Sequence, residues 1–155
     1  MIMKPFNVII CLFLTISLTS IAHAKKIARK PITEVSTNNA PAVIGAYSQA
    51  VKTQYLDYLS GQIGIDPKTG ELVSDAFRPQ AEQVFKNLRS VASASGGSIN
   101  NIAKITVYLT SFENYTALNE VLAQYIDKPY PARSVVQVSA LPKGALIEIE
   151  GVMAK

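Results

Sequence analysis

The chain has 155 residues, with one cysteine, one histidine and no tryptophan. Cys11 and His23 both lie within the first 24 residues, so a chain that begins after residue 24 has neither a thiol nor an imidazole. That excludes Ser-His-Asp and Cys-His nucleophilic catalysis, disulfides, and zinc sites built on Cys or His. A content of 48% hydrophobic and 17% charged residues indicates a globular protein.

The net charge of +4 is concentrated near the start of the chain. Residues 25–30 alone contain three lysines and one arginine, whereas residues 31–155 contain ten basic and eleven acidic residues, a net charge of −1. Binding to nucleic-acid phosphates needs cations clustered on one face. We therefore predict a near-neutral folded body that does not bind nucleic acid.

Residues 1–24 have the order of a secretory signal peptide. Lys4 precedes an apolar run over residues 8–22, and the small-residue pattern Ala22-His23-Ala24 follows it. A membrane-spanning helix needs about 20 apolar residues, more than this run provides. We predict cleavage after residue 24, no membrane attachment after cleavage, and an exported protein that is periplasmic or secreted. A basic tail over residues 25–31 then precedes one domain over residues 32–155.

The first half of this domain is predicted to contain short strands and one long helix. Residues 32–36 and 55–60 have strand composition, and the sequence of residues 66–70 is typical of a turn. Apolar residues at helical spacing then predict a helix over about residues 79–95, with Gly96-Gly97 at its end.

In the second half, a β-branched run predicts a strand over residues 102–109. A helix is expected from about residue 114 to just before Pro129, and two final strands over residues 134–138 and 146–153. Two amphipathic helices on one face of a mixed sheet define an α+β fold. No third helix covers the other face of the sheet, so we predict that the chain forms an oligomer through that face.

Two features could carry chemistry. Glu148 and Glu150 alternate with isoleucines, so both carboxylates lie on one face of a strand. This pair could act in chemistry, but the same pattern is typical of a strand face exposed to solvent. Arg133 precedes an apolar strand and has no acidic residue within five positions. It needs an anion, which could be Glu148 on a neighbouring strand or the carboxylate of a substrate held by the guanidinium. The residues alone leave both possibilities open.

Seven short motifs, in order along the chain, resemble those of the RidA family, also called the YjgF or reactive-intermediate deaminase family. They are residues 39–42 (NAPA), 44–50 (IGAYSQA), 60–63 (SGQI), 66–71 (DPKTGE), 131–134 (PARS), 141–143 (LPK) and 147–150 (IEIE), and the family's helix asparagine corresponds to Asn119. The resemblance covers nearly the whole predicted domain.

The resemblance implies a YjgF/chorismate-mutase-like fold and a homotrimer with active sites in the clefts between subunits. It also implies hydrolysis of 2-imino and 2-enamino acids, such as 2-iminobutyrate and 2-aminoacrylate, to 2-keto acids and ammonia without a metal or organic cofactor. Arg133 would bind the substrate carboxylate and Glu148 would position water. The remaining site residues would bind or enclose the substrate; they are Tyr47, Ser60, Gly61, Asn119 and Val135.

Three features depart from what the family leads us to expect. Val135 stands where members commonly have cysteine, the loop over residues 126–130 is short, and the chain carries an export signal. A backbone N–H remains at Val135, so deamination stays the leading hypothesis. A non-catalytic protein that binds or senses a small carboxylate in the same cleft is the alternative. Ribonuclease activity, which has been attached to some relatives, is a third hypothesis.

Overall fold

The computed structural model describes residues 31–155, so the predicted signal peptide and all but the last residue of the basic tail lie outside the described residues. The described chain forms one six-stranded mixed sheet in the order β1-β2-β3-β6-β4-β5. Its strands are β1 (Thr33–Val35), β2 (Ala50–Lys52), β3 (Leu56–Ile63), β4 (Ile102–Leu109), β5 (Ala132–Gln137) and β6 (Ile147–Ala154). Only β4 and β5 are parallel, and α2 (Tyr115–Tyr125) connects them.

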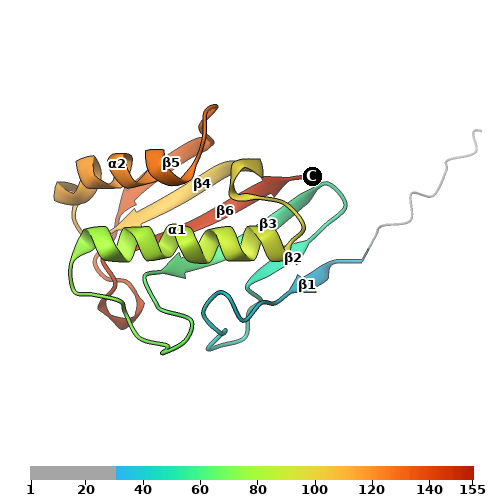
Figure 1. Cartoon of the computed structure of the whole chain (residues 1–155), viewed down its shortest axis with the longest axis horizontal. Coiled ribbons are helices and arrows are strands. Elements are labelled where there is room, and N and C mark those ends of the chain that lie inside the picture. The colour runs from blue at the N-terminus through green and yellow to red at the C-terminus, as the bar shows by residue number, and fades with distance from the viewer. Residues whose placement is uncertain (1–30) are drawn as a thin grey trace, which may run out of the picture.

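Two helices cover one face of the sheet, as the sequence predicts. Both α1 (Phe77–Ala94) and α2 lie across the same side of the strands and pack against each other (Figure 1). The apolar stripe of α1 is fully buried and includes Phe85 and Leu88. It meets the inward side chains of the central strands, such as Ile105 and Ile149. Burying each of these side chains contributes roughly 1.5–3 kcal/mol, so this interface is the core of an α+β domain.

Helix α1 ends close to the predicted position. The main chain turns at Gly96, whose φ of 90° lies in the left-handed region that glycine adopts without a Cβ clash. The N–H groups of Gly96 and Gly97 donate to carbonyl groups of the last helical turn. These contacts explain why the Gly96-Gly97 pair predicts the end of this helix.

Some strand boundaries differ from the predictions. Strand β5 begins at Ala132, two residues earlier than expected, so Arg133 lies within the strand and not before it. Strand β3 continues past Ser60 to Ile63. The three-residue strand β2 has no sequence counterpart in our predictions, because it is too short to show alternation.

The sheet face opposite the helices has no cover within the described residues. It carries the outward side chains of β3, β4 and β6, among them Tyr58, Tyr108 and Glu150. Tyr58 is 46% exposed on this face. The prediction that another subunit covers it stays a prediction. None of the helices within residues 31–155 is long and apolar enough to span a membrane.

Candidate active site

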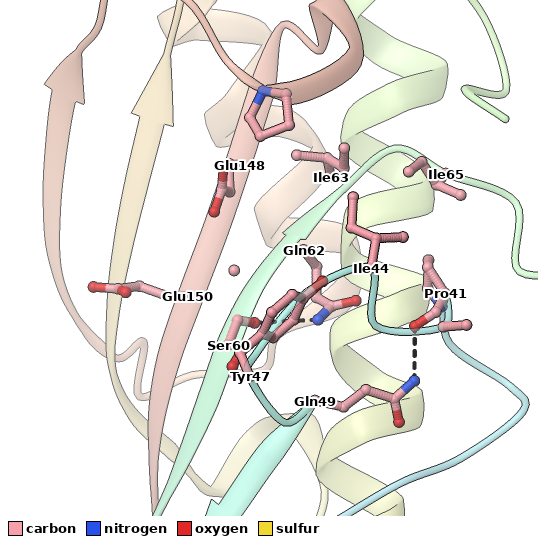
Figure 2. A pocket seen from close by; sticks show the side chains of 13 residues that line it. Pro41, Ile44, Tyr47, Gln49, Ser60, Gln62, Ile63, Ile65, Glu148 and Glu150 are labelled. Atoms are coloured by element: carbon pink, nitrogen blue, oxygen red, sulfur yellow. Dashed lines mark hydrogen bonds between the residues drawn. The ribbon is translucent and has the colours of Figure 1, made fainter. Parts of the chain in front are cut away.

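Glu148 lies in a cavity of about 430 Å³ at the open side of the sheet. Figure 2 shows its surroundings: Glu148 and Glu150 project from β6, while Ile44 and Tyr47 come from the loop that precedes β2. Ser60 and Gly61 of β3 also line this cavity, together with apolar residues that include Ile63 and Pro142. Four of the predicted site residues therefore share one cavity, which we call the Glu148 pocket; they are Tyr47, Ser60, Gly61 and Glu148.

Gly61 creates the space that the Glu148 carboxyl group occupies. A Cβ placed on Gly61 would lie 1.9 Å from Oε1 of Glu148 and 2.8 Å from its Cδ. The pairing of β3 with β6 also shifts register between Leu59 and Gln62, which is a β-bulge at this position. The carboxyl group thus lies directly against the main chain of β3, a position open only beside glycine.

A buried amide fixes the loop that carries Ile44 and Tyr47. The Nε2 group of Gln49 donates to the carbonyl oxygens of Thr37 and Pro41, at 3.0 and 2.8 Å. Its Oε1 accepts from the backbone N–H of Thr37 at 2.6 Å. Gln49 lies within the IGAYSQA motif, but no role was predicted for it. A polar residue directly before the apolar start of β2 was the available signal.

The environment of Glu148 favours its protonated form. Burial raises the pKa of the Glu148 carboxyl group, and the negative charge of Glu150 raises it further. On the adjacent strand, the Tyr108 hydroxyl group lies 3.3 Å from Oε1 of Glu150 and donates to it. A carboxylate with a raised pKa is a stronger base than an ordinary glutamate, as suits a group that takes a proton from water.

Arg133 lies at a second cavity, of about 570 Å³, next to α2. Its Nη1 donates to Oδ1 of Asn119 at 2.8 Å, and its Nη2 donates to the hydroxyl oxygen of Tyr115 at 3.2 Å. Tyr130 also lines this cavity. We call it the Arg133 pocket. It contains two predicted site residues, Arg133 and Asn119, whereas the contact with Tyr115 was not foreseen.

The positive charge of Arg133 is not neutralised by any carboxylate within residues 31–155, where the ion pairs involve other residues. Both groups that hold the guanidinium, the Asn119 amide and the Tyr115 hydroxyl, are neutral. A guanidinium has five N–H donors, and these two contacts leave three of them for a ligand. The Arg133 pocket can therefore bind an anion such as a carboxylate through two parallel hydrogen bonds.

Val135 lies on the same strand as Arg133, at the edge of the sheet. Its side chain packs against the core, so it does not enter either pocket. The N–H of Val138 donates to the carbonyl oxygen of Leu109 on β4. Because main-chain groups alternate in direction along a strand, the N–H groups of Arg133 and Val135 point toward the free edge. Within residues 31–155 no strand pairs with this edge, so the N–H of Val135 has no partner strand there.

The two pockets lie on opposite faces of the sheet within one chain. Arg133 pairs with the buried Ile105 and faces the helices. Glu148 pairs with Tyr108 on the open face, and β4 lies between β5 and β6. The possibility that Arg133 pairs with Glu148 on a neighbouring strand of the same chain is therefore wrong. Their strands are not neighbours, and the two side chains lie on opposite faces of the sheet.

The chain matches the protein-family model described as Endoribonuclease L-PSP over residues 37–155. The chain belongs to this family. A human relative, 2-iminobutanoate/2-iminopropanoate deaminase, is 45% identical over 118 residues, which cover 76% of this chain and 86% of the human protein. A RutC family protein of Pyrococcus horikoshii is 46% identical over 121 residues, which cover 78% of this chain and 96% of that protein.

Solved structures of the L-PSP family share the fold. The crystal structure of RidA from the Antarctic bacterium Psychrobacter sp. PAMC 21119 superposes with a TM-score of 0.77 at 47% identity. It covers 79% of this chain and 99% of the RidA chain. Both the resemblance to RidA and the α+β fold with two helices on one face are confirmed.

Proposed function

We propose that this protein hydrolyses 2-imino acids, and their enamine tautomers, to 2-keto acids and ammonia. The observation that carries the proposal is the guanidinium of Arg133. Two neutral groups hold it, and its other three donors have no partner among residues 31–155. A substrate carboxylate would neutralise this charge. The names of the human and house-dust-mite (Dermatophagoides farinae) relatives, 2-iminobutanoate/2-iminopropanoate deaminase, support the same class of substrate.

The complete site would form between two subunits. Because the Arg133 pocket and the Glu148 pocket lie on opposite faces of one sheet, one substrate reaches both groups only when two chains meet. We propose a homotrimer in which the edge strand β5 of one subunit approaches the Glu148 pocket of the next. This arrangement would also cover the open face of the sheet, which a single chain leaves exposed.

The reaction then requires only water and the groups of these two pockets. Arg133 and the N–H of Val135 would bind the carboxylate, and this holds the C=N carbon beside Glu148. Glu148 would accept a proton as water oxygen bonds to that carbon, and would return it to nitrogen. This gives a carbinolamine. Transfer of its hydroxyl proton to nitrogen as the C–N bond breaks then releases ammonia and forms the C=O bond of the 2-keto acid. Tyr47 and Ser60 would enclose the substrate in the Glu148 pocket.

A trapping assay tests this proposal. An amino-acid oxidase generates the imino acid, and semicarbazide competes with the protein for it. Compared with a reaction without the protein, we expect the wild type to lower the yield of semicarbazone. Arg133→Ala should give the same yield as the reaction without the protein. Arg89→Ala, which removes an exposed arginine that lies over the Tyr125 ring, is the matched control and should behave as wild type. Equal yields for wild type and Arg133→Ala would refute the deaminase proposal.

A non-catalytic carboxylate-binding or signalling protein would use the same free guanidinium. It predicts saturable binding of a 2-keto acid that depends on Arg133, without turnover. Measurable turnover in the trapping assay would rule this out as the sole role.

Ribonuclease activity is not proposed, because the net charge of −1 over residues 31–155 does not favour contact with an RNA backbone.

We also propose that the protein is exported, with imino acids from amino-acid oxidation outside the cytoplasm as its substrates. The similarity to the Pyrococcus horikoshii protein uses 78% of this chain but 96% of that protein. The family match begins only at residue 37. The N-terminal segment is thus additional to the family domain, which is consistent with a targeting role. N-terminal sequencing of the mature protein should begin at Lys25.

A further inference from the structure

The side chain of Arg133 is fixed by two residues that lie one turn apart on α2. Tyr115 and Asn119 are spaced i, i+4, so both project from the same side of the helix. Tyr115 makes two kinds of contact with the guanidinium. Its hydroxyl oxygen accepts from Nη2 at 3.2 Å, and its ring centroid lies 5.5 Å from Cζ. Tyr115 is 40% exposed, so it lies at the surface and is not part of the core.

Fixing an arginine before its ligand arrives has an energetic consequence. A free arginine side chain loses much rotamer entropy when it is immobilised on binding. A side chain already held by Tyr115 and Asn119 loses less, and this favours binding. A carboxylate in either position would hold the guanidinium as well but would neutralise it. A neutral tyrosine and a neutral asparagine hold the side chain and leave its charge for the ligand.

We propose that Tyr115 is a positioning residue for Arg133, whose hydroxyl and ring hold the guanidinium in the orientation that receives the substrate carboxylate. This inference rests on the proposed function, because it concerns the same anion. It differs from a packing role, in which Tyr115 would act through its edge contact with Phe112, whose ring centroid lies 6.4 Å away. Removal of the hydroxyl alone separates the two roles, since the packing contact needs only the ring.

The experiment compares Tyr115→Phe with wild type in steady-state kinetics on an imino acid and in binding of 2-oxobutanoate. We expect KM and Kd to rise about 3- to 10-fold, the effect of losing one modest hydrogen bond. We expect kcat to change by less than about 2-fold, because the carboxylate is held equally in the ground state and in the transition state. Tyr55→Phe is the matched control, because this tyrosine is 71% exposed at the β2–β3 turn. Loss of its hydroxyl should change neither KM nor Kd.

A double-mutant cycle tests whether Tyr115 acts through Arg133. In an Arg133→Lys background the guanidinium is absent, so adding Tyr115→Phe should raise KM by less than about 2-fold. Equal effects of Tyr115→Phe in both backgrounds would overturn the inference, as would an unchanged KM in the single variant. If Tyr115→Phe lowers Tm as much as Tyr115→Leu does, the role is structural and the inference also fails. A wild type that neither binds nor turns over refutes the proposed function itself; an active wild type with an unaffected Tyr115→Phe refutes only this inference.

Discussion

Arg133 and Glu148 lie on opposite faces of the sheet, although a single strand, β4, separates their own strands. Arg133 faces the helices and contacts α2, whereas Glu148 lies in the pocket on the open side. One chain therefore holds two incomplete halves of the proposed site. This relationship makes the proposed function depend on assembly.

Two inactive variants should restore activity when they assemble together. Arg133→Ala lacks the anion-binding half and Glu148→Gln lacks the base, so each alone is expected to be inactive. In mixed oligomers made by unfolding and refolding an equal mixture, about one site in four would combine an intact Arg133 with an intact Glu148. Recovery of about a quarter of wild-type kcat per site is expected. No recovery in oligomers shown to be mixed would place the whole site within one chain.

The pH dependence of kcat/KM should report Glu148. Burial and the charge of Glu150 raise the pKa of Glu148, so the basic form is lost at a higher pH than for an ordinary glutamate, and activity falls from there as pH decreases. Glu150→Gln removes only the charge, so its acid limb should move part of the way to lower pH. Tyr108→Phe, which removes the hydroxyl that donates to Glu150, serves as a control for the loss of that hydrogen bond. An acid limb unmoved by Glu150→Gln would contradict this assignment.

Glu148 should also reduce stability at neutral pH. A carboxyl group with a higher pKa in the folded than in the unfolded state binds more protons when folded, so stability falls as pH rises through this range. Glu148→Gln has no charge to lose and is expected to have a higher Tm than wild type at pH 7. The difference should shrink at a pH below the usual range of glutamate. A lower Tm for the variant at pH 7 would show that ionised Glu148 is stabilised by contacts not identified in this pocket.

Alanine at position 61 should displace the carboxyl group of Glu148, the proposed base. The added Cβ would lie 1.9 Å from Oε1 of Glu148, so the side chain must move. We expect kcat to fall about 10- to 100-fold, as is typical of a displaced catalytic group. The far-UV circular dichroism should stay unchanged. Gly45→Ala is the comparison, because its Cβ would meet the nearest atoms of Tyr47 at an ordinary 3.7 Å. Equal loss in both variants would point to general disturbance of the fold.

The periodic parts of the fold could be predicted from the sequence. The apolar spacing of α1 and its glycine stop gave the helix, and the β-branched run over residues 102–109 gave both ends of β4. The predicted start of β5 is two residues too late, since Arg133 lies within the strand. In the structure it is paired with Ile105 and held by α2, which are tertiary contacts without a local signal.

The geometry of the site could be predicted only in part. The family motifs include Arg133 and Glu148, one from each pocket, but the separation of these two residues depends on the order of strands in the sheet. The sequence does not show that β5 pairs with β4 and not with β6.

Buried amides were also missed: Asn87 donates to two carbonyl groups at and just after the end of β3, and Gln80 accepts from the N–H of Leu146. Such residues look like surface positions until their partners are known.

Strand β5 makes a chain that is not assembled with other copies prone to aggregation. Its outer edge pairs with no other strand within residues 31–155, and Val136 on this strand is 43% exposed. Exposed strand edges with apolar side chains promote the addition of further strands and hence aggregation. Substitutions that weaken the proposed contacts between subunits are therefore expected to appear first as loss of solubility at high protein concentration, before secondary structure is lost. Protein quality control in the cell would then act on unassembled chains, so the amount of enzyme would depend on the efficiency of assembly.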